Sequence, residues 1–322
     1  YELRLIVSEI NAGYLDIKAG GALNAVSALI QATGIDLDVG ELNILSEREI
    51  FEKRIVFEGK EKWYGGNQSS EDIFRDEYVI PTLIKTDKLN ARVNGKTTIE
   101  AAQILVKEES TLYSKGDVNI LAKYDIHVHD HKSSKSYVFN MDKGNLKVAG
   151  TKTVKEHFYG ETPVPTLYYN QGNFYGYSEG KIHILGSKII GDNIYLFAEK
   201  GIKLEAAEFH QDKLVTISEQ GLRTGFSSNN GTHSVNAELF SHEEKTNFKN
   251  TFYEPSELIA RNNLVLETPE LVEIISSKMQ FDKAKVKARG LHIHTHSNQM
   301  QFESTTTSIS TGLHFGIQEN IS

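Results

Sequence analysis

The chain has 322 residues, and 25 Gly with only five Pro, three Met and one Trp is a composition typical of β-rich proteins. Its 35 Lys and Arg against 43 Asp and Glu give a net charge of −8, which argues against a general nucleic-acid binder. Because there is no cysteine, disulfides, thiolate zinc sites and cysteine nucleophiles are excluded.

The first predicted elements are two matching segments, "GYLDIKAG" (13–20) and "TGIDLDVG" (33–40), offset by 20 residues. Both alternate apolar and polar residues, as β-strands do, and neither has a helical period. Such a short unit cannot bury its own apolar face, so copies must stack, with Leu15 over Ile35 in rungs about 4.8 Å apart. This predicts an all-β fold, a parallel β-helix with about 20 residues per rung. The alternatives are an antiparallel sandwich and a propeller, whose blades need roughly 40 residues.

Later segments repeat the pattern. "ELNILSEREI" (41–50) and "DVNILAKYDI" (117–126) match, and "NIYLFAEKGI" (193–202) joins them after a shift of one residue. The offset of 20 recurs between 192–204 and 212–224, which predicts that Ile194 stacks over Leu214. Further copies lie at 256–268 and 284–295.

Less regular stretches near 51–82, 131–180 and 227–255 interrupt the repeats and hold four of the five prolines. We predict loops or extra-helical hairpins there, inserted at turns. None resembles an interdomain linker, so residues 1–322 are predicted to be a single β-helix. The chain begins with Tyr, and we expect it to be a fragment of a larger protein.

Two runs of alternating histidines raise the question of a metal site: His127, His129 and His131, and His292, His294 and His296. The repeats put Ile126 and Val128 on the inward face of the helix, and likewise Leu291 and Ile293. The imidazoles would then project outward about 6.6 Å apart, and two of them could share a zinc ion. Further ligands are not identifiable, so we favour outward polar positions over a metal site.

Stacked carboxylates raise the possibility of an enzyme, because polysaccharide lyases and hydrolases also use β-helices. The offset of 20 stacks Asp16 on Asp36, and further downstream it pairs Asp192 with Asp212 and Glu199 with Glu219. Lys18 and Lys200 lie near these positions, which favours solvated charge ladders.

The segment "HFYGETPVPTLYYNQGNFYGY" (157–177) is rich in Phe and Tyr. Exposed aromatic side chains suit contact with a protein or a glycan. The alternative is that they pack on the flank of the helix as a covering hairpin. This segment is the best binding candidate in the sequence.

The segment "GDVNILAKYDIHVHDHKSSKSYVFN" (116–140) resembles the haemagglutinin repeat of filamentous-haemagglutinin-like exoproteins of Gram-negative bacteria. The segments at 256–268 and 284–304 resemble the same family, and the resemblance extends from about Ala12 to the end. It implies a right-handed β-helix rod, secreted by a two-partner pathway, in an adhesin or a contact-dependent growth-inhibition (CdiA-type) effector. The family's "NPNG" and "VENN" signatures do not occur, which suggests an internal piece of the stalk.

The sequence thus predicts a non-enzymatic, surface-exposed stalk segment, with contact to a host or neighbouring cell as a possible further role. The expected partners are an outer-membrane two-partner-secretion transporter and a cell-surface receptor, with no nucleic acid. No catalytic, cofactor-binding or metal residue is assigned, and no cofactor is expected. The alternative is a polysaccharide-processing β-helix enzyme, a lyase or a hydrolase, with a carboxylate site on one outer face.

Overall fold

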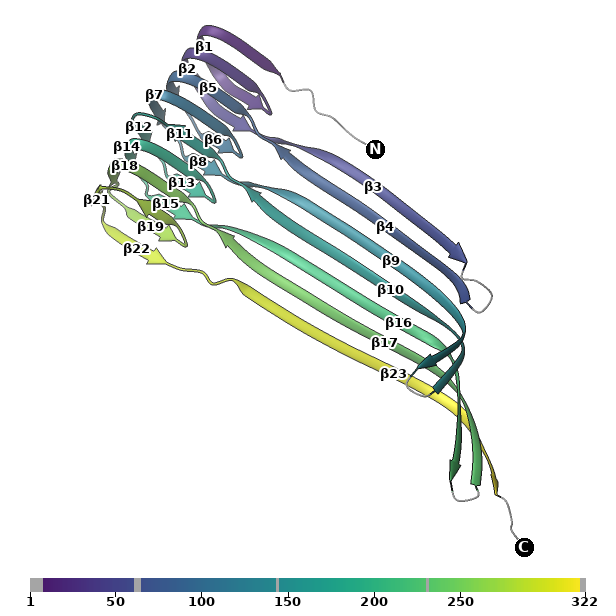
Figure 1. Ribbon diagram of the computed structural model, residues 1–322. Helices are drawn as coiled ribbons and strands as arrows, with labels where there is room; N and C mark the ends of the chain where they lie inside the picture. Colours follow the sequence, from purple (N-terminus) through teal and green to yellow (C-terminus); the bar gives the residue numbers. More distant parts are fainter. Residues whose placement is uncertain (1–7, 61–64, 143–144, 230–231, 319–322) are drawn as a thin grey trace.

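The computed structural model describes residues 8–60, 65–142, 145–229 and 232–318. All regular secondary structure in these ranges is β-strand, and they contain no helix that could cross a membrane. Sixteen strands form one parallel sheet that coils around a core, and seven form an antiparallel sheet beside it (Figure 1). The predicted parallel β-helix is therefore confirmed, and its right hand stays a prediction.

The β-helix is a stack of rungs whose starting residues lie in one register column. This column runs through Glu9, Leu29, Leu83, Gln103, Leu167, Lys188, Glu257 and Lys278. The strands of the helix are β1 (Glu9–Val26), β2 (Leu29–Leu45), β5 (Leu83–Val93), β6 (Thr97–Glu100), β7 (Gln103–Ser114), β8 (Val118–Leu121), β11 (Leu167–Asn170), β12 (Phe174–Ser178), β13 (Ile182–Leu185), β14 (Lys188–Ala198), β15 (Ile202–Glu205), β18 (Glu257–Glu267), β19 (Leu271–Ile275), β20 (Lys278–Gln280), β21 (Lys283–Lys287) and β22 (Gly290–His294).

Inward and outward residues alternate along each strand, and the inward side chains form the core. In β2, Ile35, Leu37 and Val39 are buried, whereas the residues between them face outward. Each fully buried Ile, Leu or Val side chain contributes roughly 1.5–3 kcal/mol. The columns continue from rung to rung, so the core is continuous along the axis.

The predicted stacking of Leu15 over Ile35 is confirmed, because these two residues pair between neighbouring rungs. The stacking of Ile194 on Leu214 is wrong: Ile194 lies between Phe174 and Leu264 in the helix. Leu214 lies outside the helix, in an antiparallel strand that pairs it with His157. The segment 212–224 alternates like a rung because a strand in any sheet has a period of two residues.

The "ELNILS" and "DVNILA" copies occupy one column, since Leu42 and Val118 both pair with Thr97. The third alignment, through Ile194, is wrong. The same column instead reaches Ile202 through Ile182, so "GIKLEA" is the counterpart of "DVNILA". In all three copies the chain leaves the helix directly afterwards.

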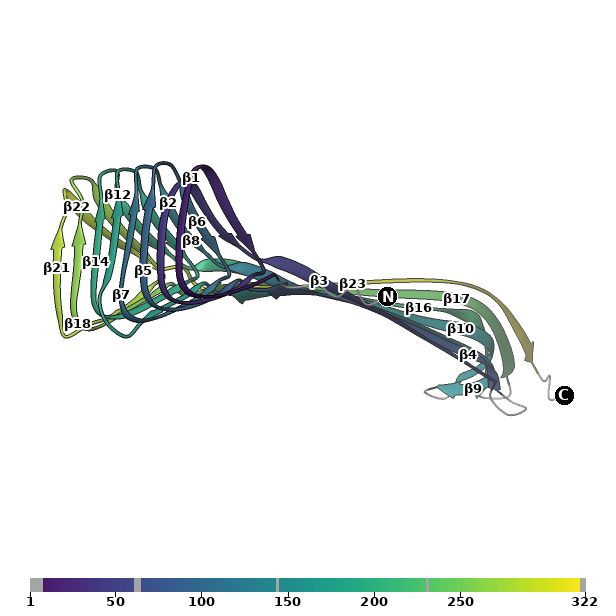
Figure 2. The ribbon, with the colours of Figure 1, turned by 90° about the horizontal axis from the view of Figure 1, so that it is seen from above.

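The antiparallel sheet consists of hairpins inserted after every second rung. Its strands are β3 (Glu47–Lys60), β4 (Gly65–Ile80), β9 (Lys123–Asp142), β10 (Asn145–Val164), β16 (Ala207–Asn229), β17 (Thr232–Glu254) and β23 (Gln299–Gln318). Each hairpin contributes two strands for every two rungs, which is one strand per rung. The distance between neighbouring strands of this sheet therefore matches the distance between rungs of the helix. Neighbouring hairpins therefore pair into one sheet that projects from one side of the helix (Figure 2).

Each expected excursion overlaps one hairpin, and two differ in extent. The second hairpin ends at Val164, so residues 167–178 return to the helix as β11 and β12. The third begins at Ala207, twenty residues before the expected stretch. Long regular strands rather than irregular loops form these excursions, which is why composition alone misplaced their ends.

A buried hydroxyl closes the mouth of each complete hairpin. Thr82, Thr166 and Ser256 each follow a proline at the point where the chain re-enters the helix, and each is fully buried. Their hydroxyls donate to the carbonyl of the last rung-strand residue before the hairpin, at Leu45 (2.5 Å), Leu121 (2.8 Å) and Glu205 (2.7 Å). They also accept a backbone N–H from the preceding corner, at Ala28, Ala102 and Ser187.

Candidate functional site

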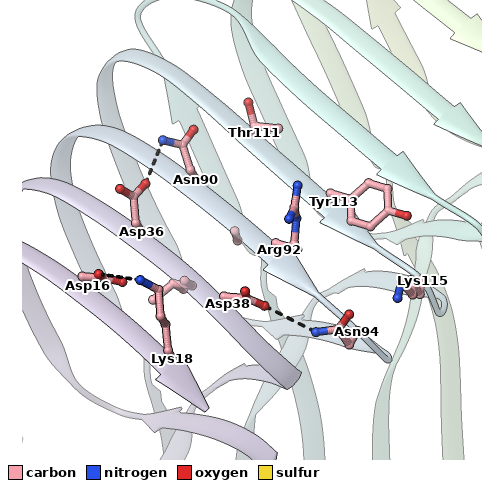
Figure 3. Close-up of a pocket in the computed structure, with 12 residues that line it drawn as sticks. Asp16, Lys18, Asp36, Asp38, Asn90, Arg92, Asn94, Thr111, Tyr113 and Lys115 are labelled. Carbon is pink, nitrogen blue, oxygen red and sulfur yellow. Dashed lines mark hydrogen bonds and ion pairs between the residues drawn. The ribbon is translucent and has the colours of Figure 1, made fainter. Parts of the chain in front are cut away.

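A polar groove of about 820 Å³ lies on the outer face of the helix, where β1, β2, β5 and β7 run side by side (Figure 3). Four rungs contribute to it, and all its polar side chains stand at outward positions of their strands or at the turns that follow. They are Asp16, Lys18, Asp36, Asp38, Asn90, Arg92, Asn94, Thr111, Tyr113 and Lys115.

The strand register builds the groove from two adjacent columns. The first column contains Asp16, Asp36, Asn90 and Thr111, and the second Lys18, Asp38, Arg92 and Tyr113. Buried residues such as Leu37 and Ala91 separate the columns along each strand and fix the outward direction of their neighbours. The first hairpin separates Asp36 from Asn90 in sequence, and the rung stacking brings them together.

Within the described ranges, each carboxylate in the groove has one side-chain partner. Lys18 Nζ donates to Asp16 over 3.2 Å, Asn90 Nδ2 to Asp36 over 2.9 Å and Asn94 Nδ2 to Asp38 over 3.4 Å. A carboxylate has about four lone-pair sites, so all three keep capacity to accept hydrogen bonds from a ligand.

Two cations in the groove have no such partner. Among the described residues, the side chains of Arg92 and Lys115 make no hydrogen bond or ion pair. Arg92 stands between Asp38 and Tyr113 in its column. The hydrogen bond to Glu179 raises the pKa of the Tyr113 phenol, and the charge of Arg92 partly opposes this effect. With three carboxylates and three cations, the groove is electrically balanced.

An aromatic ladder continues both columns along the helix. Tyr177 stacks between Tyr113 and Phe197, with ring centroids 4.9 Å apart on each side, and Tyr175 stacks on Tyr195 at 5.0 Å. The rings are nearly parallel, so each covers the face of the next and their edges point outward. Burial raises the pKa of both the Tyr175 and Tyr177 phenols. The ladder forms a rigid wall beside the groove rather than a set of open ring faces.

The carboxylate predictions have mixed outcomes. Asp16 does stack on Asp36. The other two pairs are wrong, because Asp212 and Glu219 lie in β16 of the hairpin sheet, opposite Tyr159 and Lys152. Asp192 instead bonds Arg261 from the next rung over 2.9 Å.

The first histidine run lies in β9, outside the helix. Ile126 and Val128 therefore do not face the helix core as predicted, since a single-layer sheet has no interior. The imidazoles face β4: His127 contacts Asp76 at 2.9 Å, while His129 and His131 both contact Asp72 Oδ1, at 3.1 and 2.7 Å. These two hydrogen bonds hold the pKa of the Asp72 carboxyl below its usual value. The run thus joins the first two hairpins.

The second histidine run begins in β22, on the last rung. Leu291 pairs with Val272 and Ile293 with Ile274, so these two residues continue the core columns as predicted. Both are exposed because β22 is the edge strand of this sheet within the part of the chain that the structure describes. Among the described residues, no group of three or more His, Asp or Glu side chains could hold a metal ion.

The aromatic-rich segment 157–177 divides between both parts of the fold. Its first residues belong to β10, and the remainder form β11 and β12 of the helix. Tyr168 and Phe174 are buried and pack against each other in the core, with centroids 4.7 Å apart. Only its outward members, Tyr175 and Tyr177, reach the ladder beside the groove.

The sequence alone does not reveal more than half of the groove's polar residues. Asn90, Arg92, Thr111 and Tyr113 belong to rungs that the repeat search did not identify, because the first hairpin breaks the offset of 20 residues. The signal was present: "KLNARV" (88–93) aligns with "GIDLDV" (34–39), which places Asn90 on Asp36 and Arg92 on Asp38. The prolines before Thr82, Thr166 and Ser256 mark where each rung resumes.

Comparison with known proteins bears on the second half of the helix and its hairpins. Residues 166–310 match the family model described as the hemagglutinin repeat. No curated protein and no solved structure matches the chain. The matched residues contain the alternation of rungs and hairpins described above, from Thr166 to β23. Residues 166–310 therefore form a filamentous haemagglutinin-like repeat region.

Proposed function

We propose that the chain is a non-enzymatic, surface-exposed segment of a secreted adhesin or contact-dependent growth-inhibition exoprotein of a Gram-negative bacterium. The hemagglutinin repeat region supports an adhesin-like β-helical exoprotein. The partners in this proposal are an outer-membrane two-partner-secretion transporter and a receptor on a host or neighbouring cell. The segment is one continuous stalk, and it belongs to a larger exoprotein.

The observation that carries the proposal is the unbroken core along the rungs. Buried columns such as Ile35–Leu89 and Ile194–Leu264 continue from rung to rung. A solenoid built in this way holds what lies beyond it at a fixed distance, and it offers long outer faces for contact. The hairpin sheet widens the rod without interrupting its core.

The contact region in this proposal is the outer groove with its aromatic ladder. A concave surface lined by several hydrogen-bonding side chains favours recognition, and the exposed guanidinium of Arg92 is available there to donate hydrogen bonds to a ligand. The chain's net charge of −8 opposes nucleic acid as the ligand.

An adhesion assay tests this function. Beads coated with the intact chain are expected to adhere to host or bacterial cells, and Arg92→Ala is expected to reduce adhesion at least several-fold. Lys85→Ala is the matched control, because Lys85 is an exposed, outward residue of the same strand, β5, outside the groove. Equal adhesion of the Arg92 and Lys85 variants on every cell type would contradict a contact role for the groove.

The second candidate function is a polysaccharide lyase or hydrolase. It is favoured by one observation, namely that Asp16, Asp36 and Asp38 line one outer groove together with Arg92. Each carboxylate, however, is bonded to its own neighbour. Chromatography of an acidic and a neutral polysaccharide after incubation with the chain decides the matter: shortened products that disappear with Asp36→Asn would establish the enzyme.

A further inference from the structure

We propose that two copies of the chain associate through the outer part of their hairpin sheets, with one sheet face packed on the other. The surface lies near the hairpin tips, on β9, β10, β16, β17 and β23, and we call it the distal apolar face. Its large members are Val138, Leu222, Phe226, Val235, Leu239, Ile309, Leu313 and Phe315. This association is independent of the outer groove, because the groove belongs to the other sheet.

The strand register places these side chains on one face of the hairpin sheet. Leu222 pairs with Leu239 in the neighbouring strand. Val235 pairs with Phe226 on one side and with Phe315 on the other. The other members belong to the same rows or lie an even number of residues away along a strand, and such residues share a face.

The charged side chains of the same strands lie on the opposite face. Glu219, Arg223 and Glu238 alternate with the apolar residues, and Arg223 Nε donates to Glu238 over 2.7 Å. Among the described residues, no Asp, Glu, Lys or Arg stands on the distal apolar face between the row of Gln220 and the hairpin tips. A face that meets its own copy brings like groups together, so freedom from charge favours a second copy as the partner.

The exposed apolar area is sufficient for a dimer. Phe226, Leu239, Ile309, Leu313 and Phe315 are between 59% and 70% exposed. Since a fully exposed aromatic side chain presents about 150–250 Å², we estimate roughly 600 Å² of apolar surface on each copy. Two copies would bury about 1,200 Å² together, which lies within the range of specific protein interfaces. A patch of this size on a sheet face is typical of an interaction site.

The distal apolar face is also complementary to itself in shape. A trough of about 740 Å³ crosses it, and its apolar lining includes Val138, Leu222 and Leu239. Phe226 and Phe315 stand exposed beyond the trough, toward the tips. A two-fold dimer needs a hollow and projecting side chains on one patch, because each copy offers the same surface to the other. Such packing brings the phenyl rings of one copy to the trough of its partner.

The position of this face leaves it accessible to a second copy. The hairpin tips lie at the end of the sheet far from the β-helix, so two copies can meet there with their helices apart (Figures 1 and 2). The hairpins pair edge to edge in one layer, so a strand added at β23 would extend the sheet and leave its face open. A second sheet packed on this face, as in a β-sandwich, covers it.

Light scattering during size-exclusion chromatography of the intact chain, over a range of concentrations, tests the inference. We expect a monomer–dimer equilibrium that persists at high salt, because salt does not screen apolar contacts. Leu239→Glu and Leu239→Lys are each expected to weaken the dimer at least tenfold, because both copies bring the same charge into the interface. An equimolar mixture of the two variants is expected to form more dimer than either variant alone.

Ile55→Glu is the matched control, and we expect it to leave the dimer unchanged. Ile55 is an exposed apolar residue of the same sheet, but it stands in a row with Asp72 and Val215 on the opposite face. Circular dichroism of each variant verifies that the fold is retained.

Three results would overturn the inference. The first is a chain that stays monomeric at every concentration. The second is a dimer that Leu239→Glu leaves intact, which would place the contact elsewhere, for example at the edge of β23. The third is a monomeric chain that binds neutral phosphatidylcholine vesicles and loses this binding with Leu239→Glu, which would assign the face to a lipid surface.

Discussion

The hydroxyl of Thr166 spans the mouth of the second hairpin and donates to the carbonyl of Leu121 over 2.8 Å. The chain leaves the helix after Leu121 and returns only at Thr166, so one buried hydrogen bond restores the continuity of the rung. The same oxygen also accepts the backbone N–H of Ala102 from the rung before.

Removing this hydroxyl should destabilise the chain. Thr166→Ala leaves the Ala102 N–H and the Leu121 carbonyl without this partner in the interior, and we expect a loss of about 1–3 kcal/mol in the free energy of unfolding. Thr166→Ser keeps the hydroxyl and is expected to cost less. Urea unfolding measures both, and an unchanged midpoint for Thr166→Ala would refute the role of the hydroxyl.

Ile194 and Leu214 should differ sharply in their contribution to stability. Ile194 is fully buried in the helix core, and Ile194→Ala is expected to cost about 2–5 kcal/mol. Leu214 is 42% exposed in β16, and Leu214→Ala should change the free energy of unfolding by about 0.5 kcal/mol or less. Equal costs in urea unfolding would restore the stacking of these two residues that the sequence suggests.

The ladder residue Tyr177 should stabilise the helix through its ring. It stacks on both Tyr113 and Phe197, so Tyr177→Ala removes two ring contacts and is expected to cost about 1–3 kcal/mol. Tyr177→Phe keeps both contacts and loses only the long hydrogen bond to Glu199. Thermal unfolding compares the variants; if the Phe variant is as unstable as the Ala variant, the stacking does not contribute.

Low pH should remove the stability that the ionised Glu219 carboxylate gives to the hairpin sheet. Burial alone raises the pKa of this carboxyl, but hydrogen bonds from Lys147 (2.7 Å) and Tyr137 (2.8 Å) outweigh it and hold the pKa below the usual 4.5. The resulting stability is present above pH 4.5 and is lost as the pH falls through the lowered pKa.

Glu219→Gln tests this pH dependence. We expect the difference in unfolding free energy between the native chain and Glu219→Gln to shrink as the pH falls from about 6 to about 3. Glu303→Gln, at an exposed position on β23, controls for the loss of one charge. A difference that stays constant across this range would show that Glu219 does not gain stability from its ionised form.

Much of the fold could be predicted from sequence, because the offset of 20 residues and the inward alternation survive wherever two rungs follow each other directly. Leu15 over Ile35 is the clearest case. The offset of 20 residues does not align rungs across a hairpin, since hairpin strands alternate with the same period as rung strands, although the shared "NIL" motif correctly places Leu42 and Val118 in one column. For this reason the periodicity wrongly aligns Ile194 with Leu214.

The groove was only half predictable. Asp16 and Asp36 stack in consecutive rungs, and the repeat identifies them. Arg92 and Tyr113 reach the same surface only because the helix resumes its register after the first hairpin, at Thr82. The position at which the chain re-enters the helix after a hairpin depends on long-range strand pairing. Local periodicity carries no information about that pairing.

The pairing of Asp36 with Asn90 across the first hairpin is the central relationship of the site, and engineered disulfides test it most directly. The chain has no cysteine, so Asp36→Cys/Asn90→Cys introduces the only two thiols. Neighbouring strands lie about 4.8 Å apart, within the range that a disulfide spans. Asp36→Cys/Val56→Cys is the control, because it follows the plain offset of 20 residues and places its second cysteine in β3. The account predicts that mild oxidation links 36 to 90 and not 36 to 56; a link at 56 and none at 90 would contradict it.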